Sequence, residues 1–200
     1  NVVSAILNEI LDPLYDTDNG FLWRSYTKEK LLHEFSRLCK IVKKEVHLPI
    51  KRSYIGYLCS NYFFQKERLN TPGNSGKKLS TIDYWNTNQG KKIIINCAKK
   101  NNRDIFNSAV FISRAPAQFS PVAAASIYKY FDAKHVLDPY AGWGDRCLAA
   151  MALGIKYTGI DSNPNLQDPF SRMIEQFSGG DKINIINDKS ENVDLESISY

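Results

Sequence analysis

The 200-residue chain lacks any apolar stretch that approaches the roughly 18 residues of a membrane-spanning helix. It opens Asn1-Val2-Val3, without Met and without a charged leader followed by an apolar run. No secretory signal is visible, and the missing Met indicates a piece of a longer protein. We therefore expect an intracellular protein, cytoplasmic or nuclear, with no membrane partner.

Cysteine and histidine are scarce, with four Cys and three His. The cysteines lie 20, 38 and 50 residues apart and form no Cys-x-x-Cys pair; they are Cys39, Cys59, Cys97 and Cys147. A metal site needs clustered thiolates and imidazoles, and a secreted disulfide framework is smaller and denser. We expect buried free thiols in a reducing compartment and no metal.

The net charge of +5 is unevenly distributed. Residues 1–115 hold 19 Lys/Arg against 10 Asp/Glu, a net +9, whereas residues 116–200 hold 7 against 11, a net −4. This asymmetry indicates two functional halves, the first suited to a polyanion such as nucleic acid. The basic positions that suggest contact are Lys40, Lys43, Lys44, Lys77, Lys78, Lys91 and Lys92. The alternative, that these lysines only solubilise helices, stays open.

Residues 1–115 are expected to form a mostly helical basic domain for substrate recognition. Residues 1–15 predict a short helix, and residues 28–46 carry the clearest apolar stripe in the chain. Helical spacing continues over residues 55–63, and residues 91–100 favour helix over strand. Residues 70–78 predict a basic loop, because they combine Gly, Pro and Asn with two lysines.

Residues 116–200 change to an alternation of strands and helices. An extended segment over 112–121 leads into a helix that Ser120 caps and Pro121 begins. The pattern then predicts strands at 135–138, 156–161 and 183–187, with helices at 145–153 and 170–177. Strands that alternate with helices imply a parallel α/β sheet.

The most informative segment runs from Asp138 to Arg146, Asp-Pro-Tyr-Ala-Gly-Trp-Gly-Asp-Arg. A strand ends in an acid, a Gly-x-Gly turn follows, and a helix begins at once. Gly142 and Gly144 let the backbone approach a ligand closely, and the helix start offers free N–H groups. Asp161 ends the next strand, where a carboxylate suits two ribose hydroxyls.

Three nucleotide sites compete for this pattern. A phosphate-binding loop needs Gly-Lys-Ser/Thr, which is absent. A dinucleotide fingerprint needs a third glycine where Cys147 stands. Asp138 would repel a pyrophosphate but suits a cationic ligand end, such as the ammonium and sulfonium of S-adenosylmethionine. The order of acid and glycines therefore favours that cofactor over a nicotinamide dinucleotide of an oxidoreductase.

Residues 119–188 resemble the first half of a class I S-adenosylmethionine-dependent methyltransferase. The segment 138–146 resembles, more narrowly, the DNA methylase-like proteins of phages and large viruses. The resemblance implies a Rossmann-like methyltransferase sheet, of which residues 116–200 hold the beginning. It implies that Asp138, Gly142 and Gly144 line the methionine end and that Asp161 holds the ribose. Other expected cofactor-binding residues are Phe119 and Ser120 over the methionine moiety, Tyr140 and Trp143 in the turn, and Asp188 at the adenine amino group.

One departure from the family pattern bears on catalysis. Amino-group methyltransferases of this kind carry Asp/Asn/Ser-Pro-Pro-Tyr/Phe after the fourth strand, and no Pro-Pro pair occurs in this chain. The catalytic residues stay unassigned, and we take truncation as the simpler explanation and an inactive relative as the other. The resemblance implies methyl transfer to a nucleic-acid base amino group, with DNA favoured over RNA. The alternative is a catalytically incomplete module that binds nucleic acid or a partner.

Overall fold

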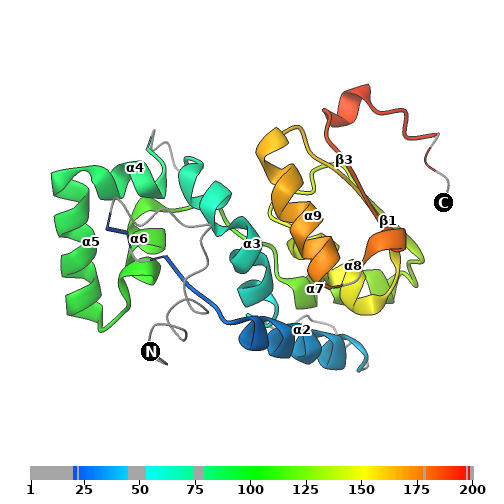
Figure 1. The fold of residues 1–200 in the computed structure, drawn as a ribbon, viewed down its shortest axis with the longest axis horizontal. Coiled ribbons are helices and arrows are strands. Elements are labelled where there is room, and N and C mark those ends of the chain that lie inside the picture. The colour runs from blue at the N-terminus through cyan, green and yellow to red at the C-terminus, as the bar shows by residue number, and fades with distance from the viewer. Residues whose placement is uncertain are drawn as a thin grey trace, which may run out of the picture. The chain divides into compact units, whose positions relative to one another are not determined.

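The computed structural model describes residues 20–21, 23–44, 53–73, 79–177, 179–196 and 198. In these ranges the protein is mixed α/β, with eight α-helices and a three-stranded parallel sheet (Figure 1). The helix expected over 1–15, most of the loop expected over 70–78, and Lys77 and Lys78 lie outside the described residues.

The chain divides into two compact units. Unit 1 comprises Asn1–Lys28 and Gln65–Ala117, and unit 2 comprises Glu29–Phe64 and Gln118–Tyr200. The expected division at residue 115 placed all of 29–64 in the first domain, whereas the structure groups these residues with the sheet. The reason is apolar packing, because Leu31, Leu38 and Phe64 are buried in the same core as Leu148 of unit 2.

Unit 1 is helical around one small core. Its helices are the C-terminal part of α3 (Tyr57–Asn70), from Gln65 onward, and then α4 (Thr81–Asn86), α5 (Asn88–Asn101) and α6 (Ile105–Ser113). Ser80 begins α4 with a capping box to Asp83, and Thr87 caps α5. The buried side chains of this core are Phe21, Leu69, Ile82, Trp85, Ile94, Phe106 and Ala109.

Helix α6 occupies part of the segment that the sequence predicts as extended. Asp104 caps it by accepting from Asn107 N–H, and the helix continues to Ser113, where Arg114 in the left-handed region ends it. The extended segment therefore begins at about residue 115 rather than at 112. The prediction was wrong at this end because Phe106 and Ala109 anchor the helix in the core of unit 1.

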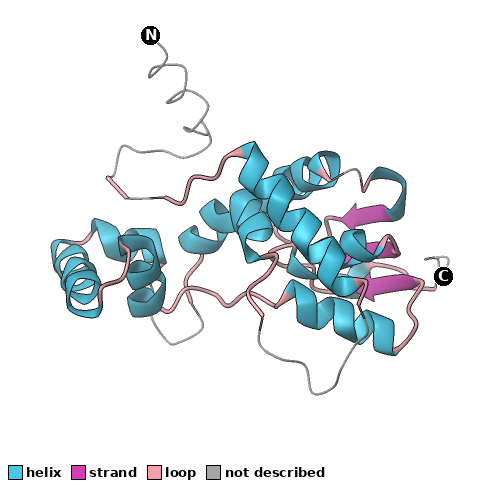
Figure 2. Cartoon of the chain, turned by 90° about the horizontal axis from the view of Figure 1, so that it is seen from below, coloured by secondary structure: helices cyan, strands magenta, loops and turns pink. Residues whose placement is uncertain are grey.

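Unit 2 contains the sheet, in which β1 (His135–Asp138), β2 (Lys156–Ile160) and β3 (Ile183–Ile186) lie in that order. Both pairs are parallel, with Leu137 opposite Thr158 and Thr158 opposite Asn184. Figure 2 shows the three strands as adjacent arrows that point the same way. The three predicted strands are confirmed, and their carboxyl ends share one edge of the sheet.

The helices of unit 2 end close to where the sequence places them. Helix α2 (Lys28–Val42) precedes the sheet, and α7 (Pro121–Tyr130) begins after the Ser120 cap. Helix α8 (Asp145–Leu153) runs between Gly144 and Gly154 as predicted. Helix α9 (Gln167–Gln176) begins three residues earlier than predicted, because a 3₁₀ turn at Pro164–Leu166 leads directly into it.

The four cysteines are all free thiols. Cys59 and Cys147 are buried, as expected, whereas Cys39 and Cys97 are half-buried. Within the described ranges, no three or more His, Cys, Asp or Glu side chains are grouped so that they could hold a metal ion. No helix of the described part is both long enough and apolar enough to cross a bilayer.

Candidate functional site

Acidic residues follow each strand at the carboxyl edge of the sheet. Asp138 is the last residue of β1, Asp161 comes directly after β2, and Asp188 lies two residues beyond β3. Parallel strands place their carboxyl ends together, which is where ligands bind in open α/β sheets. The structure therefore brings the predicted acids to one edge.

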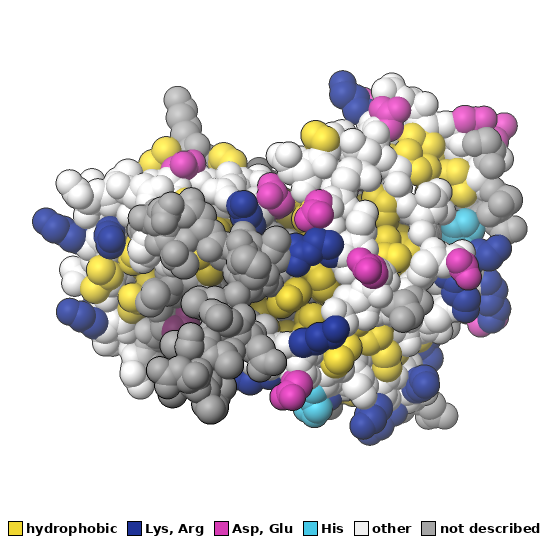
Figure 3. Space-filling model, viewed as in Figure 1, with side chains coloured by type: hydrophobic (Ala, Val, Ile, Leu, Met, Phe, Trp, Pro, Cys, Tyr) yellow, Lys and Arg dark blue, Asp and Glu magenta, His cyan; other side chains and the backbone are white. Residues whose placement is uncertain are grey.

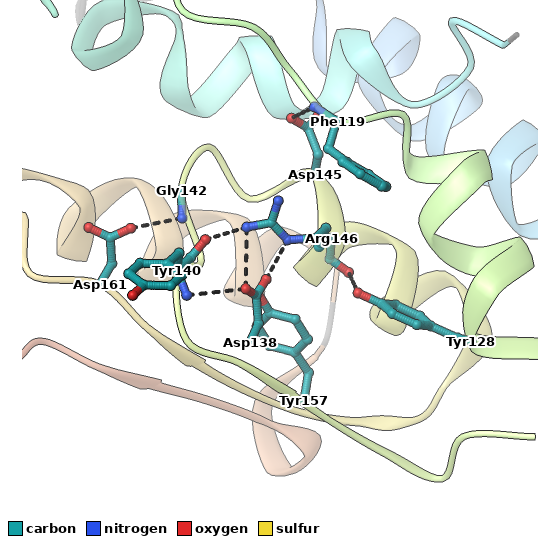
Figure 4. Close-up of polar contacts among 9 residues, drawn as sticks. All are labelled: Phe119, Tyr128, Asp138, Tyr140, Gly142, Asp145, Arg146, Tyr157 and Asp161. Carbon is teal, nitrogen blue, oxygen red and sulfur yellow. Dashed lines mark hydrogen bonds and ion pairs between the residues drawn. The ribbon is translucent and has the colours of Figure 1, made fainter. Parts of the chain in front are cut away.

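Asp161 contacts the glycine turn directly (Figure 4). Gly142 N–H donates a hydrogen bond to Asp161 Oδ2 over 2.8 Å, and Asn163 N–H donates to Oδ1 over 3.0 Å. Ala141 N–H also donates to the carbonyl of Ile160, over 2.8 Å. These bonds join the turn after β1 to the end of β2, so two predicted parts of the site form one structure.

The two glycines of the turn have different surroundings. Both have positive φ, 58° at Gly142 and 73° at Gly144, which a glycine adopts without strain. A Cβ at Gly142 would meet only the Tyr140 carbonyl oxygen at 3.6 Å and Arg146 at 3.9 Å. A Cβ at Gly144 would lie 2.5 Å from the Phe64 ring and 3.0 Å from Met173 Cε. Gly142 thus leaves room beside the turn, whereas core packing itself requires Gly144.

Asp138 is engaged by an arginine that the sequence analysis gave no role. Arg146 Nε lies 2.6 Å from Asp138 Oδ2, and its guanidinium also donates to Asp138 Oδ1 and to the Tyr140 carbonyl. The Asp138 side chain is 8% exposed and that of Arg146 is 30% exposed. The buried carboxylate is therefore neutralised within the protein. The sequence signal for this pair was the position of its two members. Asp138 ends β1, and Arg146 lies in the first turn of the helix that follows.

Tyr157 of β2 is the second partner of Asp138. Its hydroxyl donates to Asp138 Oδ2 over 2.6 Å. The pKa of Tyr157 is raised, mainly by burial and to a smaller extent by the nearby Cys147 and Asp138. Tyr140 differs, because its side chain is 71% exposed although its backbone N–H donates to Asp138 Oδ1. Trp143 is half-buried against the core of unit 2.

A buried acid that the sequence analysis used only as a helix start joins three segments of unit 2. Asp145, in the first turn of α8, accepts from Ser60 Oγ over 2.5 Å and from Gln118 Nε2 over 3.4 Å. Its Oδ2 accepts from Phe119 N–H over 3.2 Å. The Phe119 ring centroid lies 5.6 Å from the Arg146 guanidinium (Figure 4). Asp145 therefore holds the predicted Phe119-Ser120 segment beside the glycine turn.

Ser120 and Asp188 already have hydrogen-bond partners within the protein. Ser120 Oγ accepts from Ala123 N–H over 3.3 Å and donates to the Ser53 carbonyl over 3.1 Å, so its hydroxyl is used in capping α7. Asp188 is exposed and accepts from Asn192 Nδ2 and Lys189 N–H, and these hydrogen bonds lower the pKa of its carboxyl. Within the described part of the chain, the Asp188 side chain forms no hydrogen bond with the glycine turn.

Comparison with protein-family models, with curated proteins and with solved structures finds no match to this chain.

Proposed function

We propose that this chain binds S-adenosylmethionine at the carboxyl edge of its sheet and belongs to a methyltransferase that acts on a nucleic-acid base amino group. The observation that supports this most strongly is the hydrogen bond from Gly142 N–H to Asp161 Oδ2. It places a strand-end acid against a glycine turn, the arrangement that a nucleoside ligand needs at a sheet edge.

The residues present fit the nucleoside part of this cofactor. A carboxylate has about four lone-pair positions, and the two backbone donors to Asp161 use only two of them. Two remain for ribose hydroxyls. The open position at Gly142 gives a ligand access to the backbone of the turn.

The amino-acid end of the cofactor would meet the ion pair of Asp138 and Arg146. Asp138 already accepts four hydrogen bonds, from Tyr140 N–H, from two guanidinium nitrogens of Arg146 and from the Tyr157 hydroxyl, so it has no free lone-pair position for the ammonium. Its part is to orient Arg146, which at 30% exposure offers donors to the carboxylate of the cofactor. Phe119, held by Asp145, would cover this end and limit the access of water.

The bound cofactor supplies a methyl group on a positively charged sulfur. The contribution of these residues is binding and orientation, which lowers the barrier by fixing the reacting groups in line. A base amino group would be presented after the base is unstacked. The described residues assign no group that contacts this nitrogen, in agreement with the absence of a Pro-Pro motif from the sequence.

A nicotinamide dinucleotide is the competing ligand. The sequence disfavours this ligand because Asp138 would repel a pyrophosphate. That repulsion is weakened in the structure, because Arg146 neutralises the carboxylate. The position of the third fingerprint glycine still differs, because Cys147 is fully buried there in the core of unit 2. The buried Cys147 thus disfavours the dinucleotide, which is included in the binding test as a comparison ligand.

Calorimetric titration of the chain with S-adenosylhomocysteine, NAD⁺ and ATP tests the proposal. We expect heat from S-adenosylhomocysteine alone. Saturable binding of NAD⁺ in preference would move the assignment to an oxidoreductase, and an absence of binding by all three would remove the nucleotide site.

A further inference from the structure

Unit 1 carries the excess positive charge of the chain. It holds 12 Lys/Arg against 7 Asp/Glu, whereas unit 2 holds 14 of each. Three lysines at the end of α2 and just beyond it that the sequence suggested for a polyanion, Lys40, Lys43 and Lys44, belong to neutral unit 2. A surface for a polyanion is therefore better sought on unit 1.

Helix α5 has one buried face and one basic face. The buried face consists of Gly90, Ile94 and Ala98, at successive four-residue steps. The exposed side chains on the opposite face are Lys92, Asn96, Lys99 and Lys100. Figure 3 shows dark blue side chains spaced along this helix, at the left of the view, with yellow hydrophobic surface between them. From Lys92 to Lys99 the helix rises about 10 Å, which spans more than one phosphate of a strand.

An exposed aromatic ring adjoins the basic face. Arg103 follows Lys100 by three residues, and its guanidinium lies 5.3 Å from the ring centroid of Phe111 on α6. Phe111 is 62% exposed, although a phenylalanine gains free energy from burial. One face of the ring carries the guanidinium and much of the remaining surface is open to solvent.

The cations of this face have no carboxylate partner among the residues that the structure describes. Within the described residues, Lys92, Lys99, Lys100 and Arg103 form no salt bridge, in contrast to Arg24, which lies 3.6 Å from Asp104. Unpaired cations beside an exposed ring are the combination that binds single-stranded nucleic acid, because lysines neutralise phosphates and the ring stacks on a base.

We propose that unit 1 binds a single strand of nucleic acid along α5, with phosphates at Lys92, Lys99 and Lys100 and a base stacked on Phe111 beside Arg103. A single strand fits better than a duplex, because a stacking ring needs a base face, and in a duplex the neighbouring stacked bases cover both faces of each base. Only the strand's identity as the methylation substrate rests on the proposed function; the surface itself depends on the charge of α5 and the exposure of Phe111.

Fluorescence anisotropy of a labelled oligonucleotide of about 15 nucleotides tests this on the whole chain without cofactor. Log affinity should fall with log salt by about 0.7 per phosphate contacted on a single strand. Replacing Lys92, Lys99 and Lys100 by Gln should flatten the slope by about 2. Replacing Lys40, Lys43 and Lys44 by Gln removes the same charge from unit 2 and should leave the slope unchanged.

The aromatic contact has its own matched pair. Phe111→Ala should weaken binding at least about fivefold with little change in slope, because stacking carries no charge. Phe131→Ala removes a ring that is 73% exposed in unit 2 and should bind like wild type. Thermal unfolding of each variant confirms that it is folded.

Three results would overturn the proposal: an α5 triple variant with the wild-type slope, a Phe111→Ala protein with the wild-type affinity, or competition by polyglutamate as strong as by the oligonucleotide. The last would assign the surface to an acidic protein partner. Because cofactor is absent, retained oligonucleotide binding with no S-adenosylhomocysteine binding would contradict the proposed function alone.

Discussion

Gly142 N–H and Asp161 Oδ2 are joined by a hydrogen bond of 2.8 Å, although 19 residues separate them in the chain. The bond closes the glycine turn onto the end of β2. Since Asp161 Oδ1 also accepts from Asn163 N–H, both oxygens of the carboxylate are oriented by backbone donors. A ligand that reaches this edge therefore meets a carboxylate that is already fixed in place.

The surroundings of Gly144 predict that this position matters for stability as well as for binding. In Gly144→Ala, the added Cβ would lie 2.5 Å from the Phe64 ring, at a backbone φ of 73°. Gly154→Ala is the matched control, because its φ is 71° and only Lys182 Nζ, at 3.9 Å, is near. The left-handed backbone costs about 1–2 kcal/mol in each, and overpacking adds about 1–3 kcal/mol at Gly144 alone.

Urea unfolding of the two glycine variants measures the difference. Equal losses in the free energy of unfolding would mean that Phe64 and Met173 move aside without cost, and the packing role of Gly144 would be lost.

Asp145 is predicted to stabilise unit 2 through its contacts with Ser60 and Phe119. In Asp145→Asn, one carboxylate oxygen becomes an NH₂ group, so at least one of the two donors loses its acceptor. We expect the free energy of unfolding to fall by about 1.5–3 kcal/mol. Asp168→Asn alters a comparable first-turn acid whose contact, with Arg172 at 3.8 Å, is largely exposed, and should change it by less than about 0.5 kcal/mol.

Chemical denaturation of both variants distinguishes them. If Asp145→Asn were as stable as Asp168→Asn, the buried network would not hold the Phe119 segment.

The elements of unit 2 were predictable where local signals define them. Ser120 and Pro121 begin α7, and Gly144 and Gly154 border α8, because capping depends on residues adjacent in sequence. The assignment of residues 29–64 to unit 2 was not predictable, because an apolar stripe on α2 does not specify which core covers it. Helix α4 was missed because it has only six residues, although Ser80 and Asp83 form a visible capping box.

The candidate site was predictable at its strand ends and less so elsewhere. Asp138, Gly142 and Asp161 follow from the strand-turn-helix pattern. The contact of Asp145 with Ser60 spans 85 residues and depends on tertiary packing, so no local spacing reveals it.

Burial of acidic protons in unit 2 predicts a loss of stability at alkaline pH. Burial raises the pKa of the Cys147 thiol and of the Tyr157 hydroxyl. In the unfolded chain a Cys thiol and a Tyr hydroxyl have pKa values of about 8.5 and 10. At alkaline pH the unfolded chain therefore releases protons that the folded protein retains. The free energy of unfolding should therefore fall as pH rises above about 8.5, by up to about 1.4 kcal/mol per pH unit for each group.

Urea unfolding at about pH 7.5 and pH 10 follows this loss. Cys147→Ala should reduce the pH slope, and a slope that is unchanged by this substitution would show that the thiol does not contribute.

The proposed hydrogen bonds from a ribose to Asp161 can be measured directly. We expect calorimetry to detect S-adenosylhomocysteine binding by the wild-type chain and a loss of about 1.5–3 kcal/mol in Asp161→Ala, from the missing hydrogen bonds to a charged acceptor. Asp181→Ala, at an exposed acid on the 3₁₀ turn that precedes β3 and so at the opposite edge of the sheet, should bind like wild type. Absence of binding by the wild-type chain, or equal binding by the Asp161→Ala and Asp181→Ala proteins, would contradict the account.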